Sequence, residues 1–139
     1  MQPRYEFFDH TADVGVRVFA PTLAALIEPA GRGLYAVVGE IKGTGEPGRQ
    51  EFVFPGDDPA LLLRDYLAEL LRLFAVQGRF VTGVEVAEFG PARLAVSVDV
   101  RTVDMTRSNL EREVKAITYH ALSIRPIPGG FVAVFVVDI

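Results

Sequence analysis

The last nine residues constrain the fold more than any other segment of the chain. An unbroken apolar run from Phe131 to Val137 is followed by Asp138 and Ile139 at the end of the sequence. A C-terminal segment is usually a frayed polar tail unless it is tied down, whereas a run of this kind is typical of a core strand. We therefore expect a buried final strand that holds Asp138 and the terminal carboxylate of Ile139 in place.

The spacing of apolar residues predicts an α+β fold, a single domain over residues 1–139. Two segments have helical spacing: one extends from a Thr22 cap to Val38, and the other begins at Asp58-Pro59 and ends near Gly78. Pro29 should kink or limit the first helix because it lacks a backbone donor. The predicted architecture is a mixed or mainly antiparallel sheet with two main helices. Strand character is found in residues 5–8, 14–19, 51–54, 80–89, 92–101, 114–122 and 131–137, and a flexible loop is expected at 43–48.

Composition excludes several classes of protein. Half of the 139 residues are apolar, which is too many for a disordered chain, and there is no cysteine for disulfides or thiolate metal sites. The formal net charge of −4 argues against broad nucleic-acid binding, which needs many Lys and Arg residues. No apolar stretch reaches the roughly 18–20 residues of a membrane helix, and the start lacks a signal-peptide pattern. We expect a cytoplasmic protein without a membrane partner.

Ionisable residues near the start of the chain offer a partner for the final carboxylates. His10 and Asp13 lie between the first two predicted strands, where turn chemistry is the ordinary explanation; Asp138 could likewise be a solvated strand end. If Asp13 lies beside Asp138 and Ile139, three anionic groups meet and require a cation. Oxygen ligands suit one divalent ion such as Ca²⁺, Mg²⁺ or Mn²⁺. His10 would then support a ligand or carry a proton.

Four blocks of sequence, spread over nearly the whole chain, occur in the order found in a known family. They are Tyr5-Glu6-Phe7-Phe8-Asp9-His10-Thr11-Ala12-Asp13-Val14-Gly15, Leu62-Leu63-Arg64-Asp65-Tyr66-Leu67-Ala68-Glu69-Leu70-Leu71, Glu113-Val114-Lys115-Ala116-Ile117-Thr118-Tyr119-His120 and Val137-Asp138-Ile139. These blocks resemble the signatures of the archease family. The resemblance implies a fold built from strand–helix–strand–strand modules.

The resemblance also implies a protein cofactor and not a free-standing enzyme. Archeases assist the RtcB-type RNA ligase in tRNA splicing and RNA repair. They promote the metal-dependent transfer of GMP from GTP to the ligase and so support multiple turnover. The implied partner is the ligase, with tRNA involved only indirectly. The family's metal ligands correspond to Asp13, Asp138 and the Ile139 carboxylate, while His10, Lys115 and His120 match signature positions that could support the ligands or contact the partner.

Two other classes of function remain open from the residues alone. A metal-independent, chaperone-like interaction module would carry the same acids as surface features. A small metal-dependent phosphohydrolase or nuclease would generally pair two metals on several carboxylates, and the sequence offers few convergent acids. The sequence also lacks a phosphate-binding Gly-rich loop of the Walker type and a serine in a nucleophile-elbow context.

Overall fold

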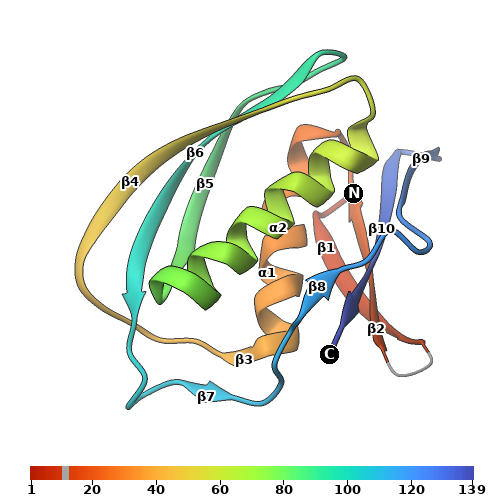
Figure 1. Cartoon of the computed structure of the whole chain (residues 1–139). Coiled ribbons are helices and arrows are strands. Elements are labelled where there is room, and N and C mark those ends of the chain that lie inside the picture. The colour runs from red at the N-terminus through yellow and green to blue at the C-terminus, as the bar shows by residue number, and fades with distance from the viewer. Residues whose placement is uncertain (11–12) are drawn as a thin grey trace.

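Two antiparallel sheets enclose a pair of helices in the computed structural model of the chain (Figure 1). The structure describes residues 1–10 and 13–139, and for His10 the backbone only. The five-stranded sheet has the order β1-β2-β10-β8, and β9 also pairs with β10. Its strands are β1 (Arg4–His10), β2 (Asp13–Ala20), β8 (Ala116–Ile117), β9 (Ser123–Ile127) and β10 (Gly130–Asp138).

The three-stranded sheet has the order β4-β6-β5 and lies on the other side of the helices (Figure 1). Its strands, together with the α2 helix, form a continuous strand–helix–strand–strand segment, as the resemblance implies. A two-stranded ribbon connects this segment to the rest of the chain. The strands are β4 (Gly43–Pro55), β5 (Arg79–Phe89) and β6 (Arg93–Val103), and the ribbon consists of β3 (Gly39–Glu40) and β7 (Asn109–Leu110).

The second helix begins where its capping residue predicts, whereas the first begins at Ile27, later than the Thr22 cap predicts. The hydroxyl of Thr22 accepts the Ala25 N–H at 3.1 Å and starts the 3₁₀ turn η1 (Ala24–Leu26), which leads into α1 (Ile27–Val38). Pro29 lies in the first turn of α1, where a missing N–H costs little, so it limits the helix without kinking it. α2 (Pro59–Gln77) is capped by the Asp58 carboxylate and ends at Gly78 in a left-handed conformation with φ of 63°.

One hydrophobic core joins both sheets and both helices. Alternate residues of β2 and β10 face α1 and α2 from one side, and alternate residues of β6 face them from the other. The fully buried members include Val16, Val18, Phe135, Leu67, Leu70, Val98 and Val100. The predicted α+β class with mainly antiparallel pairing is therefore confirmed. Among the described residues, no helix is both long and apolar enough to cross a membrane.

The strands β3, β7 and β9 are not among those expected, and two expected segments differ in the structure. The predicted loop at 43–48 is the first part of β4, which pairs with β6 across an irregularity between Thr44 and Gly48. The predicted strand at 114–122 is reduced to the two residues of β8. Val114 and Ile117 are both buried, so the segment does not alternate as a regular strand would.

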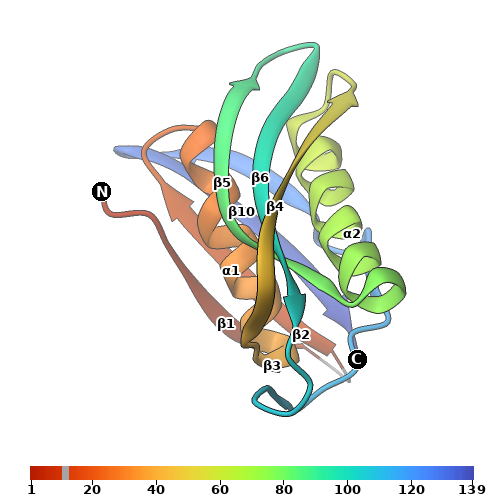
Figure 2. The same ribbon diagram turned by 90° about the vertical axis from the view of Figure 1, so that its left-hand side faces the viewer.

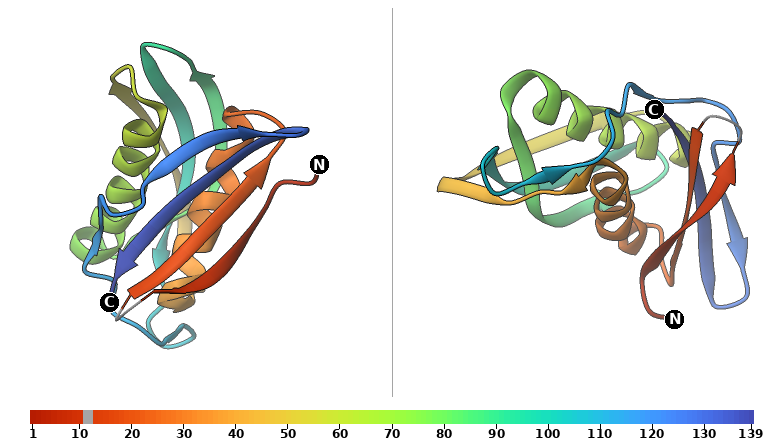
Figure 3. Two further views of the ribbon diagram at one scale, coloured as in Figure 1. Left: turned by 90° about the vertical axis from the view of Figure 1, so that its right-hand side faces the viewer. Right: turned by 90° about the horizontal axis from the view of Figure 1, so that it is seen from below.

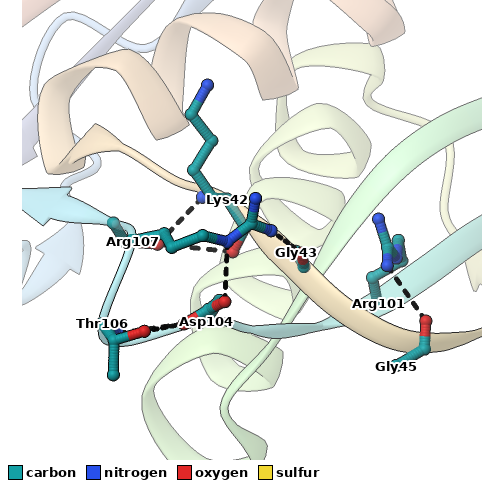
Figure 4. A network of polar contacts seen from close by, with 8 residues as sticks. Lys42, Gly43, Gly45, Arg101, Asp104, Thr106 and Arg107 are labelled. Carbon is teal, nitrogen blue, oxygen red and sulfur yellow. Dashed lines mark hydrogen bonds and ion pairs between the residues drawn. The ribbon is translucent and has the colours of Figure 1, made fainter.

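A polar network fixes the turn that leaves β6 (Figure 4). The Asp104 carboxylate accepts the Thr106 N–H at 3.0 Å, the Thr106 hydroxyl at 2.7 Å and Arg107 Nε at 2.8 Å. Arg107 also donates to the Gly43 carbonyl at 2.6 Å, and the Ser108 hydroxyl accepts the Lys42 N–H at 2.8 Å. The start of β4 is thereby tied to the segment that leads to β7 and β8.

Candidate functional site

Asp13 and Asp138 are direct cross-strand neighbours. Asp13 is the first residue of β2, Asp138 is the last of β10, and the two are paired in the antiparallel register of these strands. Paired residues of this kind point to the same face of a sheet, with Cβ atoms roughly 4.5–5.5 Å apart. Both side chains are half-buried, and Figure 3 shows the C-terminus beside the start of β2. Asp13 therefore lies beside Asp138 as considered from the sequence, because the second strand, β2, pairs with the last strand, β10.

The segment around Lys115 forms hydrogen bonds with β10 on the side opposite β2. The Lys115 N–H donates to the Asp138 carbonyl at 2.8 Å, and the Thr118 N–H donates to the Val136 carbonyl at 2.9 Å. From α2, Arg64 Nε donates to the Ile117 carbonyl at 3.1 Å, and its guanidinium lies 4.0 Å above the Tyr119 ring. Residues from all four sequence blocks therefore lie at the end of β10 or at β8, which pairs with it.

A pocket of about 330 Å³ opens beside Asp13. The Phe8 ring crosses the neighbouring strand over Gly15, where any Cβ atom would collide with it. Arg112 reaches this pocket from the segment before β8, and its Nη1 donates to the Val37 carbonyl at 3.2 Å. The residues that line the pocket are Phe7, Phe8, Asp9, Asp13, Val14 and Arg112. Sequence reasoning missed Arg112, since no local pattern connects it with the first strands.

The sequence from residue 5 to residue 139 matches the model of the Archease protein family. The chain belongs to the archease family. A protein archease from Thermococcus gammatolerans is 33% identical over 141 residues, which span 98% of this chain and 99% of that protein. One from Thermococcus kodakarensis is 32% identical over 141 residues, with the same shares of the two chains.

Solved structures have the same fold as this archease. A solution structure of a protein from Methanobacterium thermoautotrophicum superposes with a TM-score of 0.74 at 26% identity and covers 97% of this chain and 98% of its own. The crystal structure of a Thermotoga maritima archease, described as a possible chaperone, has a TM-score of 0.69 at 22% identity and covers 95% and 94%. The second likeness supports the fold alone.

The other predicted site residues of this archease are His10, Lys115 and His120. The backbone of His10 pairs with Asp13, while its side chain and the next two residues lie outside the described part of the chain. The side chains of Lys115 and His120 are exposed, so both are accessible to a partner. The Lys115 backbone, and not its ammonium group, makes the described contact with Asp138. Their roles stay predictions.

Two of the carboxylates expected to bind a hard cation lie together in the structure. In residues 1–9 and 13–139 there is no group of three His, Cys, Asp or Glu side chains that could hold a metal ion. Asp13 and Asp138 supply two carboxylates at the ends of β2 and β10. The terminal carboxylate of Ile139, one residue beyond Asp138, is the nearest along the chain. A set of three carboxylates would suit Ca²⁺, Mg²⁺ or Mn²⁺.

Proposed function

We propose that this archease is a metal-binding accessory protein that activates an RtcB-type RNA ligase. It would promote GTP-dependent guanylylation of the ligase and multiple turnover in tRNA splicing and RNA repair. Membership of the archease family supports this role. The structural observation that carries the proposal is the cross-strand pairing of Asp13 with Asp138 at the end of the chain. Asp13, Asp138 and the Ile139 carboxylate are the proposed ligands of one divalent cation.

The proposed site suits a reaction that depends on charge. Nucleotidyl and phosphoryl transfers are catalysed mainly by positioning and charge neutralisation, and a divalent cation, when bound, supplies positive charge for phosphate oxygens. The chain itself contributes fixed carboxylates: register holds Asp13 and Asp138 together, and the Lys115 N–H holds the Asp138 carbonyl at 2.8 Å. Ile139 is exposed, so a partner could reach this end of the chain.

A guanylylation assay tests the proposal. Purified RtcB-type ligase, GTP and limiting archease are combined with Ca²⁺, Mg²⁺ or Mn²⁺, and ligase-bound GMP is measured. Asp13→Ala is expected to abolish the stimulation because it removes one of three anionic ligands. Asp57→Ala, which removes an exposed carboxylate before α2, is the matched control and should stimulate like the wild type. Undiminished stimulation by a folded Asp13→Ala protein would refute the metal site.

A metal-independent, chaperone-like module is the second candidate function. The exposed aromatic residues Phe7 (47%) and Tyr119 (66%) favour it, since they could contact a partner without a cation. One residue added after Ile139 separates the two candidates. The extension moves the terminal carboxylate by roughly 3.3 Å, which should abolish stimulation through a metal site and leave simple docking intact. Turnover of GTP or RNA by the isolated protein would instead favour a phosphohydrolase.

A further inference from the structure

A second cavity, of about 420 Å³, opens between α1 and the free edge of β5. It shares no lining residue with the pocket beside Asp13. Figure 2 shows α1 between β1 and β5 on this face of the molecule. Its volume lies within the roughly 300–1,000 Å³ of typical small-molecule sites. The walls and floor are largely aromatic and aliphatic, and they include Tyr5, Tyr35, Tyr66, Leu70, Phe80 and Val84.

The Tyr66 hydroxyl lines this cavity without a hydrogen-bond partner. The Tyr66 side chain is only 1% exposed, and a Cβ atom at Gly31 would lie 3.6 Å from its hydroxyl. No group in the described part of the chain donates to this hydroxyl or accepts from it. Burial raises the pKa of Tyr66, so the phenol keeps its proton. The Tyr66 hydroxyl is thus available to an acceptor on a ligand that fills this cavity.

A second phenol offers another donor close by. The Tyr35 hydroxyl accepts the Val81 N–H at 2.9 Å, which leaves its own hydrogen available. Burial raises the pKa of Tyr35 to about 12, so this group is also neutral at physiological pH. The two charges at the cavity, Glu28 and Arg32, pair with each other through contacts of 3.0 and 3.2 Å. The cavity therefore offers hydrogen-bond donors and aromatic surface with no unpaired charge.

We propose that this cavity binds a small, uncharged aromatic molecule that carries a hydrogen-bond acceptor, such as a heteroaromatic carbonyl compound. Its rings would pack against Tyr5, Tyr35 and Phe80, and its acceptor would take the Tyr66 O–H. An anion or a cation would have to break the Glu28–Arg32 pair to gain a partner. This site is separate from the proposed metal site, and its test does not depend on the ligase.

The edge of β5 favours a small molecule over an extended peptide. A peptide that added a strand here would need unpaired, regular backbone groups along β5. The Val81 N–H is already occupied by Tyr35. The register of β5 also shifts between Val81 and Gly83 and again between Val86 and Glu88, and irregularities of this kind protect sheet edges from strand addition.

Quinolin-2-one, an uncharged bicyclic carbonyl compound, is the probe for this site. It is titrated into the ¹⁵N-labelled chain, and amide chemical shifts are recorded. Saturable changes are expected at Gly31, Val81 and Gly83, which line the cavity. Tyr66→Phe removes one hydrogen bond and should weaken binding roughly threefold to tenfold. Tyr119→Phe changes an exposed tyrosine outside the cavity and should bind like the wild type.

Gly31→Ala is a second variant that does not alter the Tyr66 ring. Its new methyl group would lie 3.0 Å from Leu70 Cδ1 and 3.6 Å from the Tyr66 hydroxyl, both at the cavity, and should weaken binding, while circular dichroism checks that the fold is retained. The proposal is overturned if millimolar quinolin-2-one leaves the Gly31 and Val81 amides unchanged. Equal affinity of a folded Tyr66→Phe variant also overturns it. So does an extended peptide that shifts the β5 amides when quinolin-2-one does not.

Discussion

At the scale of single residues, the Asp104 carboxylate is stabilised by several hydrogen bonds from neighbouring residues. Its hydrogen bond with Arg107, followed by those with Thr106, lowers the pKa of Asp104 from 3.8 to about 2. The side chain lies in the turn that ties β4 to the segment before β7 (Figure 4). Its ionised form therefore favours the folded chain.

The pH dependence of folding follows from this lowered pKa. Because the folded state holds the proton less tightly than the unfolded state, the Asp104 contribution is fully present above about pH 4. It is lost as the pH falls toward 2. Asp104→Asn should flatten the loss of unfolding free energy over that range, as measured by urea denaturation. Arg107→Gln should raise the pKa of Asp104 in a carboxyl NMR titration. An unchanged titration in Arg107→Gln would contradict the assignment.

Asp13 and Asp138 show how much of the candidate site can be predicted from the sequence. Asp13 opens a strand with alternating apolar residues and Asp138 follows an unbroken apolar run, so their meeting required only that those strands be neighbours. Arg112 comes from a polar segment without periodicity, and a hydrogen bond to the end of α1 determines its position. Its place beside Asp13 depends on tertiary contacts that no local pattern encodes.

At the scale of elements, the Asp58 cap is the clearest link between sequence and structure. Asp58→Ala removes the acceptor of the Ala60 N–H, which lies at 3.0 Å, and should lower the free energy of unfolding by about 1 kcal/mol. Asp57→Ala is the matched control, because it removes a neighbouring exposed carboxylate outside the cap. Urea denaturation measures both variants. Equal losses in the two would show that general charge, and not capping, stabilises α2.

Elements with strong periodicity were predicted correctly, whereas those that depend on their neighbours were not. The α2 helix and the strands β5, β6 and β10 follow the predicted segments within a few residues. The first part of β4 contains three glycines and a proline, which are typical of a loop. It is a strand because β6 provides hydrogen-bonding partners across an irregular register. The region of β8 is held by β10 and Arg64, so side-chain alternation does not govern it.

At the scale of the whole molecule, a shared core predicts cooperative unfolding. Leu67 is fully buried on α2 and belongs to the cluster that includes residues of both sheets. Leu67→Ala should cost roughly 2–5 kcal/mol, and both sheets should still unfold in one transition. Hydrogen exchange at β2 and β6 amides, followed through urea denaturation, measures this. Separate transitions for the two sheets would contradict a single cooperative unit.

The path of the whole chain explains why the proposed metal site lies at the end of β10. Segments from both ends of the chain and from α2 meet there, because β2 and β8 flank β10 and Arg64 holds β8. The central claim is that this convergence creates a site for one hard divalent cation. Binding should depend on each carboxylate, since affinity for such ions depends strongly on the number of charged ligands.

Isothermal titration calorimetry with Ca²⁺, Mg²⁺ and Mn²⁺ tests this claim most directly. We predict one binding site for at least one of these ions in the wild-type chain. Asp13→Asn and Asp138→Asn should each weaken binding by about tenfold or more, while Asp57→Asn should bind like the wild type. The absence of binding by all three ions at millimolar concentration, or undiminished binding by folded Asp13→Asn and Asp138→Asn variants, would contradict the account.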